Sequence, residues 1–161
     1  MNESTFDIAT AYHEAGHAVI AMALGRSVQC VSVIPNEQRL GICEFKKGAS
    51  RRADDRIEAE ILILLAGMAA EAMQTGEYGW DEAGQDLRHA RVLTLRRGGS
   101  PTKAERLERR LLDKVEHLLS QPGHRRAVET IAEELRRNGR ISGRAARHHF
   151  ELALASDSQD E

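Results

Sequence analysis

Apolar residues along the chain recur mainly at three- and four-residue intervals, the spacing that is typical of amphipathic helices. Proline, glycine and capping residues separate the periodic segments and indicate where each helix begins and ends. Ser4 to Asp7 predicts a capping box in front of the first helix. The pattern predicts helices over residues 7–25, 52–74, 85–97, 101–120, between the breaks at 121–123 and 138–139, and from 142 to 154.

A different pattern lies between the first two predicted helices. Val28–Ile34 is rich in β-branched residues and ends at Pro35, and a second apolar run, Leu40–Phe45, follows a polar turn. Two such runs predict a hairpin or two strands of a small sheet, and Gly41 is typical of an edge strand that another segment approaches closely. We therefore expect a mainly α (α+β) fold with a small two- or three-stranded sheet near the N-terminal half.

Composition limits the size of the fold and its partners. The chain has 161 residues, of which 41% are hydrophobic and 30% are charged, so one core under a charged surface is expected. We expect a single domain over residues 1–155 and a polar tail over 156–161. Because 23 lysines and arginines face 25 aspartates and glutamates, the chain lacks the basic excess of a nucleic-acid-binding module.

The longest apolar run, Ile61–Ala70, is about half the length of a membrane-crossing helix, so no membrane span is expected. The acidic N-terminal segment lacks the basic and apolar regions of a secretory signal. Cys30 and Cys43 are too few for a disulfide framework or a four-cysteine zinc site. Together these features predict a cytoplasmic protein.

The sequence His13-Glu14-Ala15-Gly16-His17 lies within the first predicted helix. Residues four apart on a helix lie about 40° apart around the axis and roughly 6 Å apart along it, so both imidazoles project from one face. Two such imidazoles can bind one zinc ion, and Glu14, which points elsewhere around the helix, can act as general base toward a water. The alternative is a surface helix with two incidental histidines.

A catalytic zinc needs a third protein ligand and an open fourth position. From the residues alone, the candidates are carboxylates and histidines well downstream, and composition does not choose among them. Cys43 is a small packing residue rather than a nucleophile, because nothing in the sequence supplies the rest of a cysteine triad.

Three separated blocks resemble the protease domain of the FtsH-type zinc metallopeptidases, a family of membrane-anchored, ATP-dependent enzymes. They are His-Glu-Ala-Gly-His-Ala at 13–18, Leu-Ala-Gly-Met-Ala-Ala-Glu-Ala at 65–72 and Ala-Gly-Gln-Asp-Leu-Arg-His-Ala at 83–90. The segment Leu40-Gly41-Ile42-Cys43 is similar to the family's edge strand. The resemblance implies a helical zincin-like metallopeptidase domain that binds one Zn²⁺ per chain.

By position, the resemblance implies that Asp86 is the third zinc ligand; a helix-opening surface acid is the alternative. Glu71 is the alternative ligand, although a role in orienting His13 or His17 through a ring N–H suits it better. His89 lies on the same helix face as Asp86 and is either a further ligand, a residue that steers substrate, or a solvated histidine.

The sequence departs from the family in three ways. Trp80-Asp81-Glu82 replaces the family's Thr-Thr-Gly before the third block, and Met68 replaces the arginine of the second block. No Walker motif accompanies the domain, so we expect a free-standing protease domain without the ATPase module. A homo-oligomer and a separate unfoldase partner both stay open.

We therefore expect a zinc-dependent metalloendopeptidase that hydrolyses peptide bonds in unfolded or flexible polypeptides, with Glu14 as the catalytic base. An extended peptide would bind alongside the edge strand at Leu40, Gly41, Ile42 and Cys43. The alternative is a non-catalytic, zinc-stabilised helical binding or adaptor module derived from such a peptidase. The intact Glu14 argues against it, because a structural zinc site has no use for a base.

Overall fold

Two helices from the first half of the chain, α1 (Ile8–Ala23) and α2 (Ala53–Thr75), pack against each other at the centre of the molecule. The computed structural model describes residues 6–35, 42–45, 53–79 and 84–159. The other elements in these ranges are α3 (Gly84–Gly98), α4 (Pro101–Ser120), α5 (Pro122–Asn138), α6 (Gly143–Gln159), β1 (Val28–Ser32), β2 (Ile42–Phe45) and β3 (Arg140–Ser142).

Small residues allow α1 and α2 to approach closely. A Cβ atom added to Gly16 would lie 2.5 Å from the Cβ of Ala70 and 2.6 Å from the carbonyl oxygen of Ala66. Both distances are shorter than any real Cβ contact, so the two backbones meet at a spacing that only glycine permits here.

The sheet has the order β2-β1-β3, with both pairs antiparallel. Val31 of β1 pairs with Cys43 on one side and with Ile141 on the other. β2 is therefore an edge strand among the described residues, as the sequence predicts. Gly143 begins α6 directly against the backbone of Val28, since a Cβ at Gly143 would lie 1.8 Å from the Val28 carbonyl oxygen.

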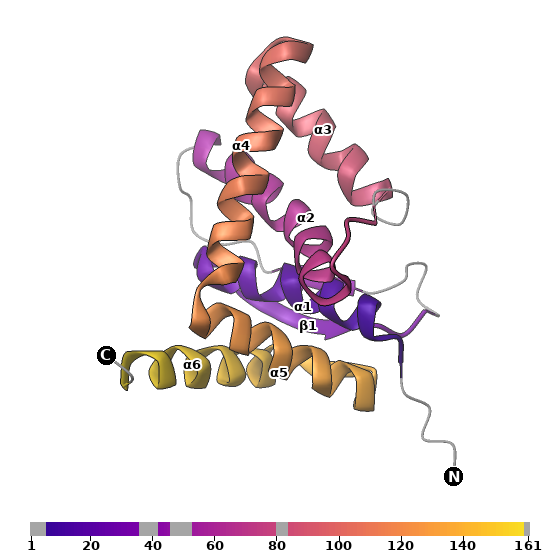
Figure 1. The fold of residues 1–161 in the computed structure, drawn as a ribbon, viewed down its shortest axis with the longest axis vertical. Helices are drawn as coiled ribbons and strands as arrows, with labels where there is room; N and C mark the ends of the chain where they lie inside the picture. Colours follow the sequence, from indigo (N-terminus) through magenta and orange to yellow (C-terminus); the bar gives the residue numbers. More distant parts are fainter. Residues whose placement is uncertain (1–5, 36–41, 46–52, 80–83, 160–161) are drawn as a thin grey trace.

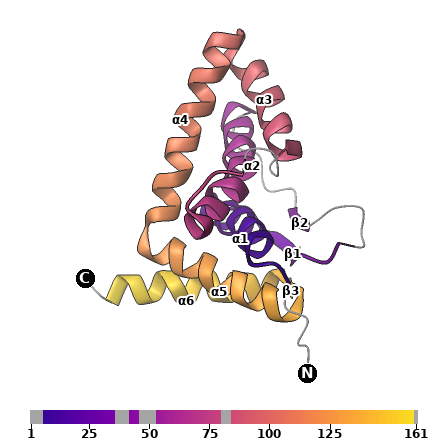
Figure 2. The same cartoon turned by 45° about the vertical axis from the view of Figure 1, so that its right-hand side comes forward.

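The outer helices lie on two sides of the central α1–α2 pair (Figure 1). α5 and α6 lie side by side on one side, where α5 packs on α1 and α6 packs on β1. On the other side, α3 and α4 form a hairpin that packs on α2 and extends away from the α5–α6 pair, as Figure 2 also shows. The hairpin thus brings the first turn of α3 beside the central helices.

The fold confirms the mainly α class with a small sheet, and the helix bounds lie close to those predicted. Ser100 and Ser142 accept hydrogen bonds from backbone N–H groups three residues later, at 3.3 and 3.0 Å, as expected of N-caps. Gly139 ends α5 with a φ of 77°. Within the described part of the chain, no helix combines the length and apolar character needed to cross a membrane.

The structure differs from the sequence-based expectations at three places. Asp7 caps α1 by accepting a hydrogen bond from the Thr10 N–H at 2.9 Å, whereas Ser4 lies outside the described residues. The last helix continues to Gln159 instead of ending at Leu154. The third strand is formed by residues 140–142, which the hydrophobic pattern does not predict as a strand. Three residues are too few to show an alternating pattern.

Candidate metal centre

His13 and His17 extend from one face of α1 toward Asp86, which lies in the first turn of α3. Their Nε2 atoms lie 2.9 and 3.1 Å from the same oxygen, Asp86 Oδ2. The two ring centroids are 4.7 Å apart, and the ring planes are nearly perpendicular. Ligand atoms about 2.0–2.1 Å from a tetrahedral zinc ion are roughly 3.3 Å apart, so the two Nε2–Oδ2 distances are close to the spacing that such an ion requires.

The other nitrogen of each ring is bound to α2. His13 Nδ1 donates to Glu71 Oε2 at 3.2 Å, and His17 Nδ1 donates to the carbonyl oxygen of Ile63 at 2.6 Å. Because both acceptors require a proton on Nδ1, a neutral ring presents an unprotonated Nε2. Two Nε2 lone pairs then face a carboxylate oxygen, and three acceptor atoms at these distances need a cation between them. The donor set therefore fits a divalent metal ion.

The pKa shifts in the cluster agree with the need for a cation between these three atoms. Burial alone would lower the pKa of His13, but hydrogen bonds to Asp86 and Glu71 outweigh burial and raise that pKa to about 10. Burial alone would raise the pKa of Asp86, but hydrogen bonds from His13 and His17 hold it well below its ordinary value. The cluster thus favours positive charge at His13 and an ionised carboxylate at Asp86, whether a proton or a metal ion supplies the charge.

Glu14 is the second residue of the motif and is only 4% exposed. Its carboxylate offers an oxygen in a group with ring nitrogens of His13 and His17, in which all ligand atoms lie within 4.8 Å of one another. Burial raises the pKa of Glu14 above its ordinary value, against the opposing effect of the two histidines. A buried carboxylate with a raised pKa has the character of a general base or acid.

The remaining candidate residues lie in other places. His89 is half exposed on α3, and its Nε2 lies 3.7 Å from Glu60 Oε1. Ile42 and Cys43 begin the edge strand β2. Leu40, Gly41 and the segment 80–82 lie outside the described residues.

Gly67, in the middle of α2, is a site residue that the sequence-based argument did not single out. A Cβ at Gly67 would lie 2.5 Å from His17 Nε2 and 2.6 Å from His13 Nε2. The sequence does contain a signal, because glycine in a helix interior is about 1 kcal/mol less favourable than alanine and therefore calls for a packing reason. The sequence does not reveal, however, that Gly67 packs against the two histidines, because that contact depends on the tertiary structure.

Comparison with known proteins places the motif in a family. The model of peptidase family M41 matches residues 4–97, which is more than half of the chain and includes His13, His17 and Asp86. The ATP-dependent zinc metalloprotease FtsH of Opitutus terrae is 30% identical over 180 residues, covering 90% of this chain and 29% of that protein.

Two further relatives match shorter regions. The ATP-dependent zinc metalloprotease FtsH 4 of Sorangium cellulosum is 34% identical over 92 residues, covering 54% of this chain and 14% of its own length. The ATP-dependent zinc metalloprotease FtsH of Magnetococcus marinus is 38% identical over 85 residues, covering 50% of this chain and 12% of its own length. The chain thus spans less than a third of the length of each of these relatives.

Proposed function

Because the chain belongs to peptidase family M41, we propose that it is a zinc-dependent metalloendopeptidase that cleaves unfolded or flexible polypeptides. The observation that carries the proposal is the convergence of His13 Nε2 and His17 Nε2 on Asp86 Oδ2, at 2.9 and 3.1 Å. Both rings are also oriented by hydrogen bonds from Nδ1, as metal-ligating histidines usually are.

In this proposal, His13, His17 and Asp86 hold one zinc ion, and Glu71 orients His13. When bound, zinc acts as a Lewis acid that brings the pKa of a water close to neutrality and polarises a peptide carbonyl. Asp86 comes from a different element than the two histidines, so the α3–α4 hairpin must be in place before the ligand set is complete.

Glu14 takes the proton from the attacking water and later delivers it to the leaving amine. Its burial supports this role, since a raised pKa makes the carboxylate a stronger base than an exposed glutamate. The same side chain can therefore serve as base and then as acid within one cycle.

The substrate proposal rests on the edge strand. β2 pairs with β1 on one side only among the described strands, so its other edge can accept an added strand. Backbone hydrogen bonds to an edge strand require an extended substrate, which unfolded and flexible polypeptides provide. We include Leu40, Gly41, Ile42 and Cys43 in this peptide-binding edge.

Replacement of the base provides the test. Glu14→Gln should reduce the hydrolysis of unfolded casein by about 10²- to 10⁴-fold, because amide oxygen is a poor proton acceptor. Zinc content, measured by elemental analysis, should stay at one ion per chain. Glu60→Gln is a matched control, because Glu60 is 45% exposed and pairs with His89 away from the cluster.

Two outcomes would contradict the proposal. Undiminished hydrolysis by the Glu14→Gln protein would show that Glu14 is not the general base. Stoichiometric zinc in the unchanged protein, without chelator-sensitive hydrolysis of casein, would favour the zinc-stabilised adaptor module instead.

A further inference from the structure

We propose that Gly67 is a positioning residue of the zinc site: its missing side chain leaves the space in which the two coordinating nitrogens and the metal ion meet. The inference rests on the proposed function, because it concerns the same metal centre. It adds a determinant that lies on α2, outside the HExxH sequence and outside the ligand set.

The distances define the conflict that any side chain at position 67 would create. A Cβ there would lie 2.5 Å from His17 Nε2, 2.6 Å from His13 Nε2 and 2.7 Å from His17 Cε1. Real Cβ atoms essentially never come within 3.0 Å of such neighbours. The methyl group would therefore conflict with both of the nitrogens that the proposed ligand set contributes.

The imidazoles cannot turn away from such a methyl group without loss. His13 Nδ1 is bound to Glu71 and His17 Nδ1 is bound to the Ile63 carbonyl, and both acceptors belong to α2, the helix that carries Gly67. Moving α1 away from α2 as a whole would instead break the close packing of Gly16 on Ala66 and Ala70. A side chain at position 67 would therefore displace imidazole rings that are held in place by hydrogen bonds, and with them the nitrogens proposed to bind zinc.

The helix itself gives no reason for glycine at this position. Ala66, Ala69 and Ala70 surround it on α2 and are all buried, and alanine is the more favourable residue in a helix interior. Outside the backbone of α2, the three described atoms nearest to such a methyl group all belong to the two imidazoles. The unfavourable residue in the helix is thus explained by the metal centre.

The first experiment measures zinc binding by Gly67→Ala in the full chain. After equilibration in a zinc buffer, the variant should hold at least 10-fold less zinc than the unchanged protein, and cobalt(II) substitution should give an altered or absent ligand-field spectrum. Leu152→Ala is the control, because Leu152 is 53% exposed on α6, and it should bind zinc normally. Equal zinc affinity and an unchanged cobalt spectrum in Gly67→Ala would overturn the inference. Absence of zinc from the unchanged protein would instead contradict the proposed function.

The second experiment separates a contact with the imidazoles from a general packing defect. In chelator, Gly67→Ala should lower the Tm of the otherwise unchanged chain. In a His13→Ala/His17→Ala background the rings are gone, so the same substitution should raise the Tm, because alanine favours the helix. A fall in Tm in both backgrounds would show that position 67 conflicts with something other than the imidazoles and would overturn the inference.

Discussion

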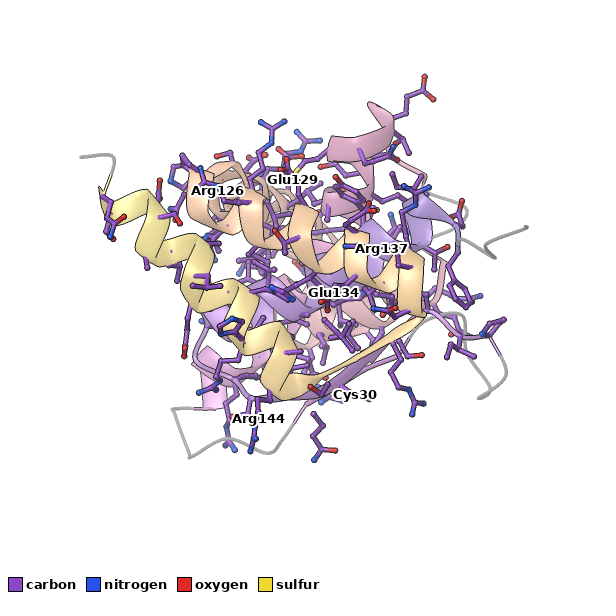
Figure 3. All side chains as sticks on the ribbon, turned by 90° about the horizontal axis from the view of Figure 1, so that it is seen from below. Cys30, Arg126, Glu129, Glu134, Arg137 and Arg144 are labelled. Atoms are coloured by element: carbon purple, nitrogen blue, oxygen red, sulfur yellow. The ribbon has the colours of Figure 1, made fainter. Side chains whose placement is uncertain are left out.

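Two regions of the molecule each bring a pair of histidines and a carboxylate together. At the centre, His13 and His17 of α1 meet Asp86, with ring centroids 4.7 Å apart. On the outer helices, His148 and His149 of α6 have centroids 5.9 Å apart, and His149 Nε2 lies 3.1 Å from Glu134 of α5. Figure 3 shows Glu134 between the ribbons of these two helices.

The comparison teaches that proximity of histidines and a carboxylate does not by itself make a metal centre. Neighbouring residues on a helix point about 100° apart, so His148 and His149 cannot aim at one point, whereas a four-residue spacing lets His13 and His17 do so. The central rings are also fixed by hydrogen bonds from Nδ1 to α2. Two features therefore mark the central region: both rings converge on one carboxylate oxygen, and each ring is also held by a hydrogen bond from Nδ1.

Removal of each histidine pair should give the largest contrast. His13→Ala/His17→Ala should abolish stoichiometric zinc binding and reduce casein hydrolysis to background, because two of the three proposed ligands are lost. His148→Ala/His149→Ala should leave both unchanged. Elemental analysis measures zinc content, and a fluorescent casein assay measures hydrolysis. Zinc retention by His13→Ala/His17→Ala would show that these histidines do not bind the ion.

Removal of each carboxylate should give a smaller contrast. Asp86→Ala should weaken zinc binding by more than about 100-fold, since loss of a direct ligand exceeds the 10- to 100-fold effect of losing an outer hydrogen-bond partner. Glu134→Ala should bind zinc as the unchanged protein does. Competition with a zinc-chelating dye measures the dissociation constants. Unchanged affinity in Asp86→Ala would transfer the third-ligand role to Glu71.

The smallest effect concerns stability in chelator as a function of pH. The pKa of His13 is about 10 in the folded protein and about 6.5 in an unfolded chain, so the protonated ring stabilises the fold below pH 6.5. This stabilisation is lost as the pH rises from 6.5 toward 10. The free energy of unfolding in urea should therefore fall between pH 7 and 9, by at most about 1.4 kcal/mol per unit. His13→Ala should show a flatter profile, and an equal slope would contradict the assignment.

The sequence predicts the helical framework well because apolar periodicity, proline and capping serines act locally. Ser100 and Ser142 are recognisable as caps from their immediate neighbours alone. Position 7 shows the limit, since Ser4, Thr5 and Asp7 all lie within four residues and offer competing caps, of which the structure uses Asp7. β3 depends on pairing with β1 across more than a hundred residues, which no local pattern reveals.

The candidate site likewise contains residues that local sequence predicts and residues that it does not. The four-residue spacing predicts that His13 and His17 share a helix face, because helix geometry alone dictates it. Asp86 and Glu71, more than fifty residues away, were selected by family resemblance, since spacing does not choose among downstream acids. The role of Gly67 requires three-dimensional distances, because an absent side chain leaves no chemical pattern to recognise.

The central position of β1 also affects how the polypeptide acquires its structure during synthesis. Ser32 of β1 donates to the Gly139 carbonyl, a partner 107 residues later in the chain. At ribosomal rates of about 5–20 residues per second, the strand must wait for roughly 5–20 seconds before this neighbour emerges. During that interval β1 exposes an open edge to other nascent chains, so slowed translation between residues 32 and 140 should increase aggregation.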